Sequence, residues 1–135
     1  MTAVDSTVLL DVLLDDPRYR ERSLKALKAE RLRGGLIVCP IVWAEASSAA
    51  RDPDDLGGLL TRAGLTYDPF DQGCADLAGA LWRSYCRLSA PRTHILPDFL
   101  IGAHAIRRGG RILSRDRGFF GRYFDGLEVV EPAAL

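Results

Sequence analysis

Four acidic residues lie at positions where their carboxylates can meet at one edge of a sheet. Asp5 follows a short apolar segment, and Glu45 lies one turn into a predicted helix. Asp98 begins another predicted helix, and Asp116 comes just after the apolar segment 111–114. Each carboxylate at the start of a helix can also be a simple cap, because it faces the unpaired amides and the positive end of the helix dipole.

Carboxylates gathered at one edge would repel one another strongly. By Coulomb's law, a pair about 5 Å apart at an effective dielectric constant of about 20 costs roughly 3 kcal/mol. Oxygen ligands with room for water suit Mg²⁺, with Mn²⁺ as the alternative, and a substrate phosphate can complete the coordination. Such an ion can activate a water molecule to hydrolyse a phosphodiester bond, which requires no histidine base. We therefore expect the four carboxylates to gather around one or two shared ions.

The elements that must position these acids alternate between strand and helix. Apolar segments predict five short strands, at residues 2–4, 36–39, 65–67, 111–114 and 127–130. Helical spacing and breaker residues predict the helices between them, at residues 7–14, 18–32, 41–50, 54–63, 71–88 and from Pro97 to the glycine pair 109–110. This alternation is typical of a mainly parallel sheet with helices on both faces. We expect a single α/β domain over residues 1–135, because a chain of this length with 47% hydrophobic residues can bury one core.

The composition argues against several other classes of protein. The formal net charge is +0, so any binding to a polyanion must be local. Cys39, Cys74 and Cys86 share no C-x-x-C spacing, which favours reduced thiols in a cytoplasm over a zinc site or disulfides. No apolar segment reaches membrane-spanning length, and acids interrupt the N-terminal segment, so we expect neither a signal peptide nor contact with a membrane.

Four motifs in this order resemble the PIN domain, and most closely its VapC-type toxin ribonucleases. They are Asp-Ser-Thr at 5–7, Trp-Ala-Glu at 43–45, Leu-Pro-Asp-Phe-Leu-Ile-Gly-Ala-His-Ala at 96–105, and Ser-Arg-Asp at 114–116 followed by Phe119. The resemblance implies a three-layer α/β/α sandwich with a five-stranded, mainly parallel sheet. It also implies a type II toxin–antitoxin system, with magnesium-dependent endonucleolytic cleavage of RNA, a homodimer, and a cognate antitoxin encoded alongside.

On this resemblance, four positions correspond to the family's acidic quartet, which binds metal and carries catalysis: Asp5, Glu45, Asp98 and Asp116. Ser6 and Ser114 match hydroxyl positions of the family, which implies that each orients a carboxylate or a bound water molecule. A turn residue is the alternative for both hydroxyls, and for Ser6 the main alternative is a helix cap.

The basic residues favour a polyanionic substrate. Lys and Arg number 18, and only two of them are lysines. Guanidinium groups bind phosphate oxygens in pairs, and Arg115 and Arg117, which flank Asp116, are candidates for phosphate contact. Codon bias can produce the same composition. We expect six arginines to crowd around the second acidic pair: Arg107, Arg108, Arg111, Arg115, Arg117 and Arg122.

The remaining acids and the two histidines have simpler interpretations. Asp11 is expected on a solvated face or at a helix end, as are Asp15, Asp16 and the acids at 52–55. His104 is expected to pack inside the protein, and His94 lies in a loop four residues before Asp98, where a contact with substrate is the less favoured interpretation.

Two other functions remain open from the sequence. A phosphoacceptor receiver domain has a similar length and an acidic metal pocket, but it needs paired acids after its first strand and a lysine after its last, which this chain lacks. In a non-catalytic interaction module the acids would be caps, and metal binding distinguishes it. The apolar faces of helices 7–14 and 18–32 exceed what one small core requires, so we expect a homodimer and a groove for an antitoxin.

Overall fold

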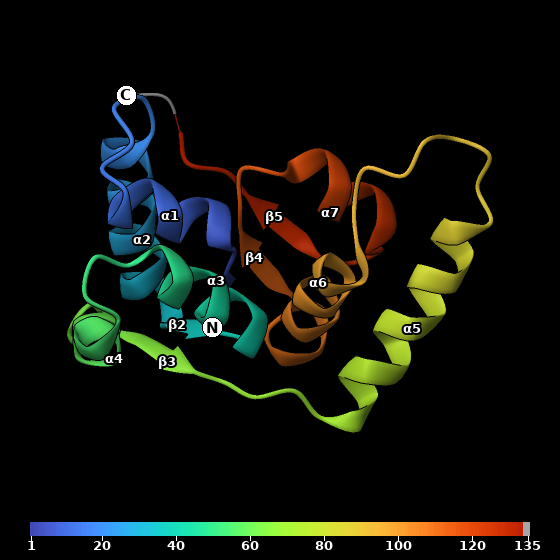
Figure 1. Ribbon diagram of the computed structural model, residues 1–135, viewed down its shortest axis with the longest axis horizontal. Helices are drawn as coiled ribbons and strands as arrows, with labels where there is room; N and C mark the ends of the chain where they lie inside the picture. Colours follow the sequence, from blue (N-terminus) through green and yellow to red (C-terminus); the bar gives the residue numbers. More distant parts are fainter. Residues whose placement is uncertain (134–135) are drawn as a thin grey trace.

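The computed structural model describes residues 1–133 and alternates strands with helices (Figure 1). Twelve elements follow one another along this part of the chain: β1 (Thr2–Val4), α1 (Ser6–Leu13), α2 (Arg20–Gly34), β2 (Leu36–Val38), α3 (Pro40–Ala49), α4 (Pro53–Arg62), β3 (Leu65–Tyr67), α5 (Gln72–Cys86), α6 (Leu96–Arg108), β4 (Arg111–Leu113), α7 (Arg117–Tyr123) and β5 (Glu128–Val130). The strands form one sheet in the order β3-β2-β1-β4-β5, and every neighbouring pair is parallel. The predicted three-layer α/β/α fold is confirmed.

The predicted elements are present, and their ends lie within a few residues of the observed ones. The exception is α7 (Arg117–Tyr123), which the sequence pattern does not predict. Its 7 residues are too few to show a helical repeat, and an isolated helix of this length is unstable. Packing stabilises it instead, because Phe119 and Phe120 are 4% and 2% exposed.

The strand order reverses between β1 and β4, in the middle of the sheet. From β1 the chain moves outward through β2 to β3, and then returns to the other side of β1 to form β4 and β5. In open α/β sheets, ligands bind beyond the carboxyl ends of the strands where the order reverses. Asp5 and Asp116 follow the two strands at this point. A receiver domain has the order 2-1-3-4-5, so the topology excludes that alternative.

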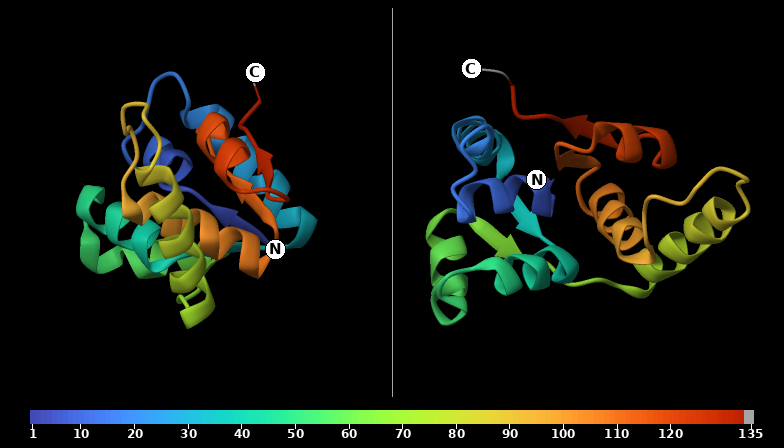
Figure 2. Two further views of the ribbon diagram at one scale, coloured as in Figure 1. Left: turned by 90° about the vertical axis from the view of Figure 1, so that its right-hand side faces the viewer. Right: turned by 45° about the horizontal axis from the view of Figure 1, so that its top comes forward.

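Helices cover both faces of the sheet. α2 packs on β1 and β2, whereas α6 packs on β1 and β4. The crossovers that contain them run in opposite directions across the sheet, and because both are right-handed they lie on opposite faces. Figure 2 shows α5 as the outermost helix, packed against α6 and away from the strands.

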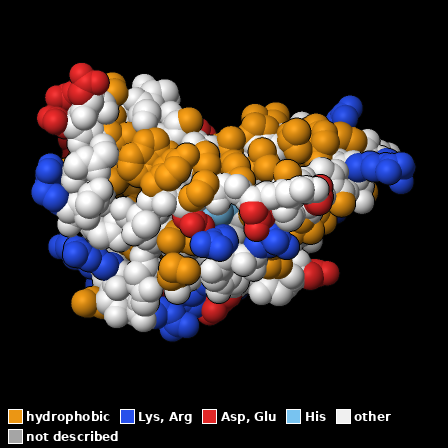
Figure 3. All heavy atoms as spheres, turned by 90° about the horizontal axis from the view of Figure 1, so that it is seen from below, with side chains coloured by type: hydrophobic (Ala, Val, Ile, Leu, Met, Phe, Trp, Pro, Cys, Tyr) orange, Lys and Arg blue, Asp and Glu red, His pale blue; other side chains and the backbone are white. Residues whose placement is uncertain are grey.

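His104 joins α6 to the segment after β3. The side chain is 1% exposed, and its Nε2 lies 2.7 Å from Oδ2 of Asp68. Arg108 donates to the same carboxylate at 2.8 Å. The expected packing position of His104 is therefore observed, with a hydrogen bond that the sequence does not predict. Figure 3 shows acidic and basic side chains next to one another on the face seen from below, beside a broad apolar area.

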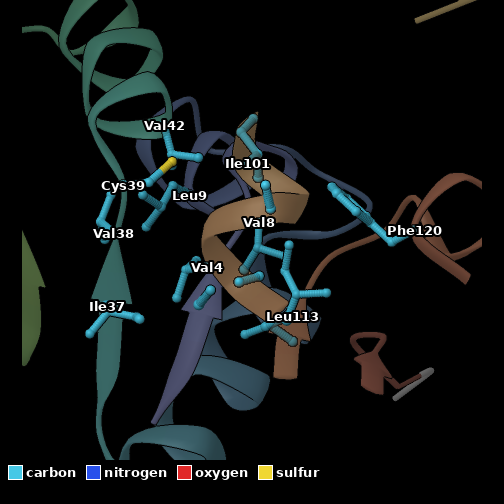
Figure 4. Packing of buried hydrophobic residues seen from close by; sticks show 14 of the residues in the cluster. Val4, Val8, Leu9, Ile37, Val38, Cys39, Val42, Ile101, Leu113 and Phe120 are labelled. Carbon is cyan, nitrogen blue, oxygen red and sulfur yellow. The ribbon is translucent and has the colours of Figure 1, made fainter. Parts of the chain in front are cut away.

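The central strands are buried, as parallel strands covered by helices must be. Val4 of β1 and Val38 of β2 are 1% and 0% exposed, and Phe99 of α6 is also 0% exposed. Figure 4 shows side chains of β1, β2, α1, α3 and α6 gathering in one core. Because such interiors are close-packed, this core fixes the strand ends from which the acidic residues project.

Asp11 lies in the interior, so the prediction that it lies on a solvated face or at a helix end is wrong. It is 2% exposed and accepts a hydrogen bond from the hydroxyl of Ser23 at 2.6 Å. Nε and Nη2 of Arg115 donate to its two carboxylate oxygens at 2.9 and 2.8 Å. The guanidinium of Arg115 also lies over the ring of Tyr19, 4.0 Å from its centroid. An arginine distant in sequence therefore neutralises this acid, which local periodicity does not reveal.

Replacing Asp11 with alanine should destabilise the fold by about 2–4 kcal/mol, because the Ser23 hydroxyl and the Arg115 guanidinium lose a buried partner. The loss is moderated because the Arg115 side chain is 32% exposed and can still reach water. Urea unfolding measures the change as a lower midpoint at unchanged slope. The control is Asp125→Ala at an exposed position, which should change stability by less than about 0.5 kcal/mol. Equal midpoints for the two variants would contradict the assigned role of Asp11.

Candidate functional site

Asp5 is the buried centre of the candidate site. It follows β1, caps α1 and is 5% exposed. Its Oδ1 accepts from the amide of Ser6 at 2.9 Å, and its Oδ2 accepts from the hydroxyls of Ser114 at 2.6 Å and Thr7 at 3.1 Å. Burial raises the pKa of Asp5, these hydrogen bonds oppose the rise, and the charge of Asp116 adds to it. The carboxylate is thus firmly oriented by neutral donors.

Ser114 connects Asp5 with Asp116. Its side chain is 0% exposed, and its hydroxyl donates to Asp5 while accepting from the backbone amide of Asp116 at 2.9 Å. The backbone amide of Asp5 also donates to the carbonyl of Leu113 at 3.0 Å. The carboxyl ends of β1 and β4 are therefore tied together, in agreement with the carboxylate-orienting role proposed for Ser114.

Glu45 projects from α3 and is a neighbour of Asp5. Burial raises the pKa of Glu45, the charges of Asp5 and Asp98 raise it further, and the Ser6 side chain lowers it. Ser6 therefore acts on two acids, through its amide on Asp5 and through its side chain on Glu45. Burial, reinforced by the charges of Asp5 and Glu45, also raises the pKa of the Cys39 thiol to about 11, so this thiol remains protonated and unreactive.

Asp98 both caps the start of α6 and belongs to the acidic quartet. Its Oδ2 accepts from the backbone amide of Ile95 at 2.9 Å, in the first turn of α6. Its charge nevertheless raises the pKa of Glu45. The cap interpretation therefore holds for one carboxylate oxygen. The other oxygen accepts no hydrogen bond within residues 1–133.

Asp116 precedes α7 but its side chain does not cap that helix. Its Oδ2 lies 2.8 Å from Nε2 of His94, and its side chain is 42% exposed. Because Asp116 raises the pKa of Asp5, the two carboxylates are close enough to repel.

The four carboxylates of the acidic quartet are electrostatic neighbours in the order Asp98, Glu45, Asp5, Asp116. They do not form a closed ligand cage, because within residues 1–133 no three His, Cys, Asp or Glu side chains are placed to hold one ion. The expected convergence of all four on a shared ion is therefore not observed. Burial is the main cause of the raised pKa values of Asp5 and Glu45, and the charges of neighbouring members of the acidic quartet add to the rise. Mg²⁺ commonly uses one or two carboxylates and keeps several water molecules. This all-oxygen set thus fits such an ion.

Three of the six arginines expected around the second acidic pair lie elsewhere, so the predicted crowding of all six is wrong. α6 extends for 13 residues, and at 1.5 Å per residue Arg107 lies about 14 Å along the axis from Asp98. Three arginines at the far ends of α6 and β4 form ion pairs: Arg107 with Asp71, Arg108 with Asp68, and Arg111 with Glu30.

The two arginines that flank Asp116 differ in their surroundings. Both carboxylate oxygens of Asp11 accept from Nε and Nη2 of Arg115, so we assign Arg115 a structural role in place of the predicted phosphate contact. Arg117 is exposed at the start of α7, and none of the ion pairs within the described 133 residues includes it. Arg117 therefore remains the candidate for phosphate contact.

Two side chains at the site were not assigned to it from the sequence. The hydroxyl of Thr7 donates to Asp5 and accepts from the amide of Arg115 at 3.2 Å. The only sequence signal for Thr7 is its place in the Asp-Ser-Thr motif. His94 reaches Asp116 from the loop between α5 and α6, and the path of that loop depends on contacts that local sequence does not show.

Comparisons with known proteins give a family and a fold. The PIN domain family matches residues 2–124, and no curated protein matches the chain. The structure is similar to a toxin–antitoxin complex from Klebsiella pneumoniae (21% identity, 100% of both chains, TM-score 0.72). It is also similar to VapBC2 from Rickettsia felis bound to a DNA fragment from their promoter (17% identity, 96% of this chain and 97% of that chain, TM-score 0.73). A third similar structure is FitAcB from Neisseria gonorrhoeae (20% identity, 100% of both chains, TM-score 0.67). Because the family match spans nearly the whole chain and the fold agrees with it, the chain belongs to the PIN-domain family.

Proposed function

We propose that this PIN-domain protein is the VapC-like toxin of a type II toxin–antitoxin pair, and that it is a Mg²⁺- or Mn²⁺-dependent endoribonuclease. The observation that carries the proposal is the chain of neighbouring acidic charges from Asp98 through Glu45 and Asp5 to Asp116. Asp5 and Asp116 follow the carboxyl ends of β1 and β4, where sheets of this kind bind ligands. The family match and the similarity to structures named as toxin–antitoxin complexes support it.

In this proposal the acidic quartet holds the ion, and neighbouring groups orient the ligands. When bound, Mg²⁺ lowers the pKa of a water molecule and offsets the negative charge of the phosphate. The hydroxyls of Ser114 and Thr7 hold the Asp5 carboxylate in place, and Ser6 assists Glu45. Arg117 contacts a phosphate of the RNA, since it is exposed directly after Asp116.

An apolar groove between α1, α2 and α4 is the proposed docking site for the antitoxin. Its cavity measures about 280 Å³, and eight leucine and valine side chains are among its lining residues: Leu9, Val12, Leu13, Leu24, Leu27, Leu59, Leu60 and Leu65. Lys28 and Arg31 contribute basic groups to the same lining. The groove therefore suits an amphipathic segment with apolar and acidic side chains, which is one of the recurrent modes of peptide recognition.

A second copy of the chain and a cytoplasmic location complete the proposal. The apolar area in Figure 3 and the exposure of Tyr67, at 49%, are consistent with a surface that is covered in a homodimer. No helix of residues 1–133 is long and apolar enough to cross a membrane. Cys39, Cys74 and Cys86 are free thiols, as a reducing compartment would leave them.

The variant Asp116→Asn tests the metal-dependent mechanism, because it removes one charge and retains the shape. We expect it to melt at a higher temperature than the wild type in chelator, since repulsion with Asp5 is relieved. Added Mg²⁺ or Mn²⁺ should raise its melting temperature less than that of the wild type. RNA cleavage should fall by several orders of magnitude, and expression should no longer arrest growth.

Asp125→Asn, at an exposed position outside the acidic quartet, is the matched control and should behave as the wild type. If the acids are only caps, removing the Asp116 charge lowers stability and leaves any activity intact. An Asp116→Asn protein that is less stable in chelator and still cuts RNA with metal dependence would refute the proposal.

The raised pKa of Glu45 predicts a pH-dependent gain in stability for Glu45→Gln. A carboxyl whose pKa is higher in the folded state binds protons more tightly there, so its ionisation destabilises the fold as pH rises. In chelator, Glu45→Gln should therefore melt above the wild type at pH 7, and the difference should shrink as pH falls toward 4. Thermal scans across this range measure it, with exposed Glu131→Gln as the control. A difference that grows on acidification would show that Glu45 is stabilised as an anion.

The variant Leu59→Arg tests the antitoxin groove. Leu59 lines the groove and is 46% exposed, so a charge there should leave the fold intact and block an apolar partner segment. Leu32→Arg, on α2 outside the groove lining and 89% exposed, is the matched control. Co-expression with the product of the adjacent gene should protect cells from the wild type and from Leu32→Arg, but not from Leu59→Arg. Equal protection against all three would place the antitoxin elsewhere.

A further inference from the structure

The loop between α5 and α6, residues 87–95, brings a histidine onto one member of the acidic quartet. Nε2 of His94 lies 2.8 Å from Oδ2 of Asp116, and the histidine side chain is 23% exposed. The two residues are 22 positions apart, so the contact depends on the path of the loop. Loop residues held in a defined position by a rigid scaffold commonly carry function.

The loop is held in place by a buried tyrosine. The hydroxyl oxygen of Tyr85, on α5, accepts from the backbone amide of Thr93 at 2.7 Å and from that of His94 at 3.1 Å. Tyr85 is only 5% exposed and packs against Phe99 and Tyr123. The backbone at His94 is therefore fixed to the aromatic part of the core.

The plane of the imidazole is fixed as well. The ring stacks on Phe119 of α7, with 3.9 Å between centroids and 10° between planes. Phe119 is 4% exposed and lies in the first turn of α7, the helix that directly follows Asp116. The ring that stacks on His94 and the carboxylate that His94 contacts are therefore only three residues apart in the sequence. His94 thus has little freedom to leave Asp116 while the loop stays anchored.

The hydrogen-bonding pattern requires only a neutral imidazole. An ionised carboxylate can only accept hydrogen bonds, so Nε2 of His94 must carry the proton and donate to Asp116. Nδ1 is then free to accept from the hydroxyl of Thr93, which lies 3.0 Å away. Both ring nitrogens are satisfied without a charge on the ring.

This contact occupies only one of the two oxygens of Asp116. Ser114 holds the backbone amide of Asp116, and His94 holds Oδ2 of its side chain. Oδ1 accepts no hydrogen bond from the described part of the chain, residues 1–133. A ligand carboxylate in metalloproteins commonly accepts a hydrogen bond on one side while it binds metal on the other, and losing that bond typically lowers metal affinity.

We propose that His94 is a positioning residue, which orients the Asp116 carboxylate so that its other oxygen can bind the catalytic cation. The inference rests on the proposed metal-dependent nuclease function and assigns no proton transfer to His94. A contact that blocked the metal site would instead engage both oxygens or displace the carboxylate toward the protein.

Two substitutions at His94 separate the hydrogen bond from the ring stacking. His94→Phe retains a ring against Phe119 and removes the donor, whereas His94→Gln retains an N–H donor and loses the ring. We expect His94→Phe to bind Mn²⁺ at least about tenfold more weakly, and His94→Gln to recover most of the affinity. Calorimetric titration of the metal-free full-length chain with Mn²⁺ measures binding without relying on activity. RNA cleavage by His94→Phe should approach the wild-type rate at saturating Mn²⁺.

Tyr85→Phe tests the anchoring of the loop and has a matched control. It removes the hydroxyl that accepts from Thr93 and His94, and it should weaken Mn²⁺ binding in the same direction as His94→Phe. Tyr123→Phe removes a hydroxyl from a ring that packs on Tyr85, 5.3 Å between centroids, and leaves the two loop amides with their partner. It should bind Mn²⁺ as the wild type does. Thermal unfolding in chelator shows whether each variant is folded at the assay temperature.

The outcomes distinguish this inference from the proposed function. If the wild type neither binds Mn²⁺ nor cuts RNA, the nuclease proposal fails and this inference fails with it. If the wild type does both and His94→Phe binds Mn²⁺ equally well, the positioning role alone is overturned. Tighter binding by His94→Phe would also overturn it, because His94 would then compete with the metal for Asp116.

Discussion

A single hydrogen bond, from the hydroxyl of Ser114 to the carboxylate of Asp5, holds the acidic site together. It joins residues 109 positions apart and closes the end of the sheet between β1 and β4. The same hydroxyl accepts from the amide of Asp116, so one buried group sets the distance between two like charges. The core beneath keeps both strand ends still.

Two buried acids on or beside α1 differ in how the protein balances their charge. Asp11 and Asp5 are 2% and 5% exposed. Asp11 meets the guanidinium of Arg115, so its charge is balanced inside the protein. Asp5 accepts hydrogen bonds only from neutral donors, and its charged neighbours Asp116 and Glu45 are also acids. Arg115 lies directly beside Asp116 in sequence but turns to Asp11, which leaves the site at the sheet edge with net negative charge. That unbalanced charge is the physical reason to expect a cation from outside the chain.

The sequence predicts those features of the fold that follow from local pattern. Strands at Leu36–Val38 and Arg111–Leu113 are short apolar segments between breaker residues, and they are found where expected. The sequence also predicts that Asp5 and Asp116 lie at the same edge of the sheet, because each follows a strand and parallel strands end at the same edge. Local sequence does not predict features that depend on partners distant in the chain: the burial of Asp11, the anchoring of His94, and the pairing of Arg107 with Asp71. Local sequence does not predict α7 either, because this helix owes its stability to the packing of its aromatic side chains.

The central place of β1 has a consequence for the time at which the site can exist. β1 precedes the other four strands of the sheet in sequence, whereas one of its two neighbours, β4 (Arg111–Leu113), is synthesised much later. Until then, Asp5 lacks both the Ser114 hydroxyl and the Asp116 carboxylate. Domains with such distant pairings also fold slowly, because a long loop must close before its contacts form. The buried surroundings of Asp5 therefore form only after residues 111–116 have been synthesised and β4 has paired with β1.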